Sequence, residues 1–269
     1  AFDWEYERLL IPKGTPDSTA TSMAARAFLD AYRELGERRY LMIAESACWF
    51  LIRGLNVDRL DENRVCFSYT PLDSSHVHNA NLFSAALLAD VGQQVGNKQF
   101  LDYARKAVSY SLEEQNPDGS WYYRSSTDFG GRHVDSYHTG FVLRNVWYLY
   151  EVLRDERIKE RLLRGYRYYS RALFLGSVPK LTPGRLYPID IYSCAEAILC
   201  LATLGGVLPE AADKACKVAE WTIRNMQDRT GHFYYRRYRP FTQKFAFIRW
   251  GQAIMFEALS CLLNTLREA

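Results

Sequence analysis

The chain has 269 residues, of which 48% are hydrophobic and 24% charged, a composition typical of a globular protein with a sizeable core. Lysine and arginine total 34 against 31 aspartates and glutamates, and a net charge of +3 argues against nucleic acid as the main partner. No stretch reaches ~18 uncharged apolar residues, so we expect no membrane span, and we also expect no signal peptide.

The first elements follow a Pro/Gly-punctuated lead-in over residues 1–18. Apolar residues at helical spacing predict a helix over Thr21–Leu35, with Thr19 or Thr21 as its cap. A break at Gly36 precedes a second helix over Arg39–Leu51. The long loop after it, roughly residues 54–77 by this periodicity, leads to the next helix.

The same pairing of helices then recurs along the chain. The later first helices are expected over Asn79–Val95, Asp135–Leu153, Asp190–Leu204 and Ala246–Leu266. The later second helices are expected over Phe100–Glu114, Arg157–Leu173 and Glu210–Met226. Turns of similar sequence, Gln115–Tyr123 and Gln227–Tyr235, follow two of the second helices. We interpret the first of these turns as a structural staple.

The breaks between units give an internal period of about 55–60 residues, each unit being a helical hairpin. First helices are apolar nearly all round and second helices are amphipathic, which indicates an inner and an outer layer. We therefore predict an all-α protein, a single α/α toroid of helical hairpins over residues 1–269. A ring of six hairpins needs more chain, so we expect an incomplete ring or one that has lost residues upstream of Ala1. The alternative, an open α-solenoid, typically has shorter repeats and plainer turns.

Polar residues stand where the predicted inner helices begin or in the loops that enter them. Parallel inner helices would bring these positions to one end of the barrel, where helix dipoles favour anions. The predicted catalytic residues are Asp135, His138 and Asp190. The predicted substrate-binding residues are Tyr69, Asp73, His78, Asn79, Tyr187, Arg249, Trp250 and Gln252.

Each of these residues also has a plainer interpretation. An aspartate such as Asp135 or Asp190 is a common helix cap, and His138 is compatible with a core position. Recurrence at equivalent positions favours function. Two carboxylates allow acid–base work on a glycosidic bond, and His138 could tune one or abstract a proton α to a carboxylate. Arg249 could pair with a uronic acid.

Other chemistries lack their motifs. The sequence has no nucleophile elbow, phosphate loop or G-x-G-x-x-G. The six cysteines form no C-x-x-C pair, which indicates reduced, buried thiols and a cytoplasmic protein. We expect no metal, because the cysteines and histidines lack zinc-site grouping, and no cofactor. The oligomeric state is left open.

Two stretches resemble unsaturated glucuronyl hydrolases, which are six-hairpin (α/α)6 toroids. Arg132-His-Val-Asp-Ser-Tyr-His138 is similar to the segment that carries their acid/base aspartate, which implies that role for Asp135. Phe247-Ile-Arg-Trp-Gly-Gln-Ala-Ile-Met255 resembles an Arg-Gly-Gln-Ala-Trp stretch of their sugar pocket, with Trp250 inserted. Their second aspartate, in a His-Asp-x-Gly-Phe context, has no counterpart.

A resemblance over nearly the whole chain is to bacterial toroid proteins that accompany exopolysaccharide biosynthesis. The stretches that carry it include Ile11-Pro-Lys-Gly-Thr-Pro16, Ser68-Tyr-Thr-Pro-Leu-Asp73, Asn116-Pro-Asp-Gly-Ser-Trp-Tyr-Tyr123 and Asp135-Ser-Tyr-His-Thr-Gly-Phe141. This resemblance implies the fold and a carbohydrate context, with an oligo- or polysaccharide as partner.

Three functions follow as hypotheses. The first is an enzyme, a glycoside hydrolase or polysaccharide lyase acting on an anionic, uronic-acid-containing glycan. The second is a catalytically silent toroid that binds polysaccharide or an assembly partner, with its acids apart or locked in ion pairs. The third is an isoprenoid-type cyclase, against which the charged residues argue.

Overall fold

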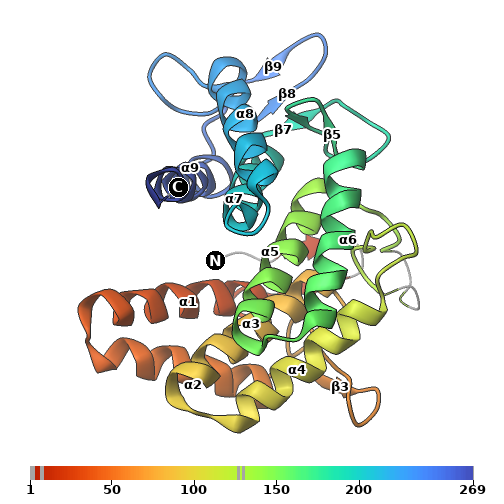
Figure 1. Ribbon diagram of the computed structural model, residues 1–269, viewed down its shortest axis with the longest axis vertical. Coiled ribbons are helices and arrows are strands. Elements are labelled where there is room, and N and C mark those ends of the chain that lie inside the picture. The colour runs from red at the N-terminus through yellow and green to blue at the C-terminus, as the bar shows by residue number, and fades with distance from the viewer. Residues whose placement is uncertain (1–3, 7–8, 126–127, 129–130, 269) are drawn as a thin grey trace. The chain divides into compact units, whose positions relative to one another are not determined.

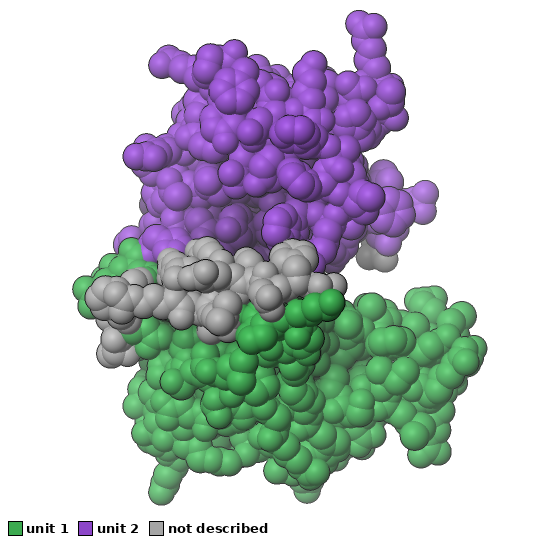
Figure 2. Space-filling view, turned by 180° about the vertical axis from the view of Figure 1, so that it is seen from behind, with its two compact units in different colours: residues 1–117, 121–132, 145–162 green, residues 118–120, 133–144, 163–269 purple. Residues whose placement is uncertain are grey.

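The computed structural model describes residues 4–6, 9–125, 128 and 131–268, which are mostly helical (Figure 1). The chain divides into two compact units, coloured separately in Figure 2. Unit 1 comprises residues 1–117, 121–132 and 145–162, and unit 2 comprises residues 118–120, 133–144 and 163–269. The expected single domain over residues 1–269 stays a prediction.

Unit 1 contains two helical hairpins and two antiparallel strand pairs. Its hairpin helices are α1 (Ser18–Leu35) with α2 (Arg38–Arg53), and α3 (His78–Val95) with α4 (Lys98–Glu113). Its strands are β1 (Trp4–Tyr6) with β2 (Leu9–Ile11), and β3 (Val57–Arg59) with β4 (Val65–Phe67). All four helices agree with the predicted periodicity to within three residues at each end.

The helix pair α3 and α4 shows the predicted two layers. Helix α3 is rich in small apolar residues and is buried continuously from His78 to Gly92, whereas α4 buries one face. Gly96 ends α3 in the left-handed region at φ 69°, where its N–H donates to the carbonyl of Gly92. A side chain would be strained there, so the glycine fixes where the helix stops.

Helix α1 differs from the prediction in two ways. Its cap is Asp17, whose carboxylate accepts the N–H of Ala20 at 2.7 Å, and neither Thr19 nor Thr21 takes that place. It also buries a single stripe that includes Ala25 and Leu29, so it is amphipathic and not apolar all round. Its serines and threonines satisfy helical spacing without supplying an apolar surface.

Two helices carry residues of both units. They are α5 (Ser136–Leu153) and α6 (Glu156–Ala172), and the first turns of α5 belong to unit 2. The turn at Gln115–Tyr123 is tied to helices on both sides. In unit 1, the side-chain amide of Gln115 donates to the carbonyl of Arg161, and the indole N–H of Trp121 donates to that of Ser111. These bonds fit the interpretation of the turn as a staple.

The remaining elements belong to unit 2. Its helices are α7 (Ile191–Leu204), α8 (Pro209–Met226), the π-helix η1 (Ile248–Ala253) and α9 (Ile254–Glu268). Its strands are β5 (Phe174–Leu175) with β6 (Val178–Pro179), and a three-stranded sheet in the order β7 (Ile189–Asp190), β8 (Arg236–Arg237), β9 (Thr242–Gln243).

The layers recur in unit 2. Helix α7 is buried from almost every side, while α8 buries the face that carries Ala211, Ala215 and Val218. The segment before α9 departs from the prediction, because its first turns form a π-helix in which the N–H of Gln252 reaches the carbonyl of Phe247. The six cysteines are free. Among the described residues, no helix has the length and apolar character needed to cross a membrane.

Candidate functional site

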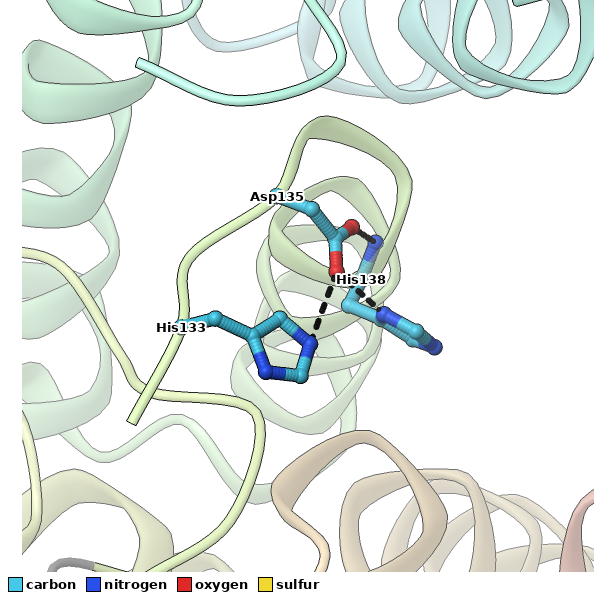
Figure 3. A group of neighbouring side chains, drawn as sticks. All are labelled: His133, Asp135 and His138. Carbon is cyan, nitrogen blue, oxygen red and sulfur yellow. Dashed lines mark hydrogen bonds and ion pairs between the residues drawn. The ribbon is translucent and has the colours of Figure 1, made fainter. Parts of the chain in front are cut away.

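The first turn of α5 places a carboxylate between two imidazoles (Figure 3). Asp135 precedes the helix, and its Oδ1 accepts the backbone N–H of His138 at 2.9 Å, as an N-cap does. Its Oδ2 lies 2.6 Å from Nδ1 of the same histidine. One oxygen therefore holds the helix start while the other orients an imidazole. The side chain of Asp135 is 7% exposed and that of His138 17%.

His133 completes this group from the loop that enters the helix. Its Nε2 lies 3.7 Å from Oδ2 of Asp135, and its side chain is 39% exposed. His133 lies in the motif Arg132–His138, but no role was predicted for it. The available signal was its spacing, because residues two apart in an extended segment point to the same side.

Aromatic rings line this group and connect it to the start of α7 within unit 2. The ring of Tyr137 lies 4.3 Å from that of His138 and 5.1 Å from that of Tyr192, measured between centroids. Phe141 lies 5.9 Å from Tyr192. The first turns of α5 and α7 are thus neighbours, as predicted for two inner helices.

Asp190, the second predicted acid, has different partners. Its Oδ1 accepts the N–H of Tyr192 at 2.9 Å and caps α7, and its Oδ2 accepts from Nε of Arg236 at 2.5 Å. The pairing of β7 with β8 sets Asp190 opposite Arg236, and the Asp190 side chain is 4% exposed. Both oxygens therefore have structural partners, and the predicted catalytic role stays a prediction.

The predicted residues of the final helix fall in η1. The amide of Gln252 exchanges two 2.8 Å hydrogen bonds with the backbone N–H and carbonyl of Phe233, which gives it a structural role. Arg249 is exposed, and its guanidinium lies 5.1 Å from the ring centroid of Trp250, which is 44% exposed. Arg249 and Trp250 are therefore open to a ligand. Tyr187 is half-buried just before β7.

Four predicted residues belong to unit 1. Asp73 organises its own loop, accepting hydrogen bonds from the backbone and hydroxyl groups of Thr70 and Ser75 and from the backbone of Tyr69. His78 is buried against Tyr110 and Ser111, and burial lowers the pKa of His78 to about 4. It is therefore neutral at pH 7.

The other two predicted residues of unit 1 are Asn79 and Tyr69. Asn79 is also buried, and its side-chain oxygen accepts no hydrogen bond from any described residue. Tyr69 packs against Val77, Ala80 and Tyr123. Convergence of these residues with those of unit 2 stays a prediction.

A buried ion pair lies one to two turns into the same helices. Arg144 on α5 donates through Nε and Nη2 to the carboxylate of Glu196 on α7, at 3.1 and 3.0 Å. Glu196 is fully buried, and this burial raises its pKa to about 7, against the lowering effect of Arg144. A side chain at Gly140 would meet Cγ of Glu196 at 2.6 Å, so this contact requires a glycine. Sequence patterns gave no signal for this pair.

One group among the described residues could hold a metal ion. A ligand atom from each of His133, Asp135 and His138 lies within 4.8 Å of the others, and this donor set suits a transition metal. The hydrogen bond between Asp135 and His138 accounts for the closest contact without a metal. The expectation of no metal stays a prediction.

A separate cavity of about 300 Å³ lies on unit 1, between α4 and the start of α6. Arg105, Glu113, Asp155 and Arg161 are among its lining residues, and none of the predicted site residues lines it.

Comparison with solved structures defines the fold as an α/α toroid, which confirms the predicted fold class. No protein-family model and no curated protein matches the chain.

Three of the structures that match are sugar-active enzymes. A cellobiose 2-epimerase from Bacillus thermoamylovorans matches with a TM-score of 0.76 at 16% identity, over 93% of this chain and 74% of its own. An unsaturated glucuronyl hydrolase specific for heparin matches with a TM-score of 0.74 at 12% identity, over 93% of this chain and 76% of its own. A GH76 α-mannanase from Bacteroides thetaiotaomicron matches with a TM-score of 0.70 at 13% identity, over 97% of this chain and 72% of its own. The resemblance to toroid enzymes therefore holds at the level of fold, and the link to exopolysaccharide-associated proteins stays a prediction.

Proposed function

We propose that the protein is a carbohydrate-active enzyme in which Asp135 and His138 act as a general acid–base pair. The observation that carries this proposal is the 2.6 Å contact between Oδ2 of Asp135 and Nδ1 of His138, with Oδ1 fixed by the helix cap. A carboxylate at Nδ1 favours the tautomer with its proton there and leaves Nε2 to take or give a proton.

The substrate class rests on three lines of support. The toroids that match include two epimerases, a D-mannose isomerase, a glucuronyl hydrolase and a mannanase. The aromatic rings of Tyr137 and Tyr192 beside the pair suit the apolar face of a sugar. Exposed Arg249 suits a carboxylate, so the proposed substrate is an anionic, uronic-acid-containing glycan.

The partners of Asp135 and Asp190 narrow the class of reaction that the site could perform. Hydrolysis by paired carboxylates needs two acids that can act on the substrate. Because Asp190 caps α7 and is paired with Arg236, a mechanism centred on His138 fits better than one centred on two aspartates. We therefore favour proton abstraction next to a carbonyl or carboxylate, as in a lyase or an epimerase, over hydrolysis.

The test is a substrate screen in heavy water with uronic-acid oligosaccharides and reducing disaccharides. A lyase forms a conjugated double bond that absorbs ultraviolet light. An epimerase incorporates deuterium at the carbon from which it removes the proton, and this is visible by NMR. Asp135→Asn and His138→Gln should abolish either signal. His232→Gln, a histidine bonded to Thr230 in the same unit, is the matched control. Equal loss in all three variants contradicts the proposal.

The second candidate is a toroid that binds glycan without turning it over. It is favoured by one observation, the ion pair that occupies Asp190. On this alternative, the wild-type protein binds uronic-acid oligosaccharides without chemical change, and Asp135→Asn keeps that binding. Turnover by the wild-type protein contradicts it.

A further inference from the structure

Two stretches of the chain carry positive charge without any acidic residue, residues 161–189 and residues 229–256, and the second lies wholly in unit 2. Residues 229–256 contain six lysines and arginines and no aspartate or glutamate. Removing these six from the 34 basic residues leaves 28 against 31 acidic residues, so the rest of the chain is net acidic. This segment includes β8, β9 and η1 (Figure 1).

Several cations of this segment are open to solvent. Two others, Arg236 and Arg237, are already hydrogen-bonded to the side chains of Asp190 and Asn225. Arg239, Lys244 and Arg249 are exposed, and none of them forms an ion pair with a described residue. Their charge is therefore available to an anionic partner.

Large aromatic rings stand among these cations. Phe241 is 56% exposed, Phe245 63% and Trp250 44%. Large exposed apolar side chains on one part of a protein suit an interaction site, and these three belong to the segment that carries β8, β9 and η1. We call the group of Arg239, Phe241, Lys244, Phe245, Arg249 and Trp250 the basic aromatic surface.

The rings are held in place by neighbours. Tyr238 stacks on Phe241 at 4.8 Å between centroids with 16° between the ring planes. Phe245 lies 6.2 Å from Phe247, which in turn meets Tyr235 edge-on at 4.7 Å. Rings with a fixed backing lose little conformational entropy on binding, so they can present a flat face to a ligand.

The surface is joined to the candidate site within unit 2. Strand β8 pairs with β7, and the carbonyl of Tyr235 accepts the N–H of Ile191 at the start of α7. The ring of Tyr192 then leads to Tyr137 beside His138. The strands that carry part of the basic aromatic surface are thus connected through α7 to the rings beside His138.

We infer that the basic aromatic surface binds an anionic polysaccharide, so that the substrate is a polymer held over several sugar units. Carboxylates along the chain pair with the cations, and sugar faces stack on the rings. An anionic lipid surface is less suited, because the rings lie on a hairpin and a π-helix and do not form the apolar face of one amphipathic helix. The inference rests on the proposed function for the choice of a saccharide.

The test measures binding of oligogalacturonates of increasing length by calorimetry at low and high salt. We expect affinity to rise with length and to fall with salt. The double variant Arg239→Ala/Lys244→Ala should weaken binding about fivefold, the size of two exposed ion pairs. Arg171→Ala/Lys217→Ala removes the same two residue types from exposed positions of α6 and α8 in unit 2 and should leave binding unchanged.

The rings are tested in the same assay. Phe241→Ala/Phe245→Ala should weaken binding about tenfold, as expected for two lost stacking contacts. Phe256→Ala, which removes a phenylalanine 77% exposed on α9, is the control. Dextran sulfate and vesicles of phosphatidylserine and phosphatidylcholine are the comparison probes.

The outcomes separate the explanations. Weaker binding of oligogalacturonate by both surface variants but by neither control variant supports the inference. Equal loss in surface and control variants, or binding to the vesicles but not to oligogalacturonate, overturns it. Asp135→Asn should keep polymer binding while losing turnover. Polymer binding that depends on the surface, in a protein that turns over no substrate, would contradict the proposed enzyme and leave this inference standing.

Discussion

Asp135 and Asp190 occupy the same position in two helices and have different surroundings. Each precedes an inner helix, each caps it through Oδ1, and each is almost fully buried. The second oxygen, Oδ2, lies beside the imidazole of His138 in Asp135, whereas in Asp190 it accepts a hydrogen bond from the guanidinium of Arg236.

An aspartate just before an inner helix can therefore have either of two partners, and its partner decides whether it suits acid–base chemistry. An imidazole beside a carboxylate can exchange protons near neutral pH. A guanidinium keeps its proton and holds its partner as an ion pair. On the proposed function, the start of α5 carries the chemistry and the start of α7 has a structural role, and four measurements test this contrast.

The largest expected effect is on turnover at Asp135. Asp135→Asn keeps a good cap but cannot stabilise a protonated His138, so kcat should fall by about 10²–10⁴-fold. The same substitution at Asp190 should change kcat by less than about tenfold, because that aspartate is occupied by Arg236. Steady-state kinetics on the substrate found in the screen checks both. Equal losses at the two positions would remove the contrast.

The next effect is on stability at Asp190. Asp190→Ala removes a cap and a charged hydrogen bond, so the free energy of unfolding should fall by about 2–3 kcal/mol. Arg236→Met keeps the cap but removes the charged hydrogen bond and leaves the buried carboxylate without its guanidinium, so it should also lower the free energy of unfolding, and a double-mutant cycle isolates the coupling between the two residues. Urea unfolding followed by circular dichroism measures each variant. A coupling near zero would show that the ion pair contributes nothing.

A third acid extends the comparison to pH. Burial raises the pKa of Glu196 from its model-compound value of 4.5 to about 7. Between these values the folded protein keeps a proton that the unfolded chain has lost, so the free energy of unfolding should fall as pH rises through that window, by about 3 kcal/mol. Unfolding curves at several pH values check this. In Glu196→Gln the fall should shrink, and an identical pH profile would place the titrating group elsewhere.

The smallest effect is expected at His133. Its imidazole is partly exposed and 3.7 Å from Asp135, so His133→Asn should lower kcat no more than about threefold, in keeping with a weak exposed pair. Kinetics over a range of salt concentrations measures the change, with His138→Gln as the comparison. A loss as large as that of His138→Gln would make His133 the acting base.

Much of the helical framework could be predicted. The run of small apolar residues in α3, the start of α5 just after Asp135 and the break at Gly96 are local signals that sequence displays directly. The stripe of α1 was harder, because helical spacing does not show which faces a neighbour covers. The π-helix before α9 was also missed, and its Gln252 is bonded to Phe233, a residue outside η1 and 19 positions earlier in the chain.

The candidate site divides in the same way. The contact of Asp135 with His138 spans three residues on one helix turn, so the sequence alone was enough to place them together. The pair of Asp190 and Arg236 spans 46 residues and exists because β7 pairs with β8. The pair of Arg144 and Glu196 spans 52 residues and needs two inner helices packed closely at Gly140. Most helices and the contact between Asp135 and His138 could be predicted from the sequence, because they depend on residues that are near neighbours in the chain. The pairing of Asp190 with a guanidinium could not, because Arg236 comes from a distant strand and reaches Asp190 only in the folded protein.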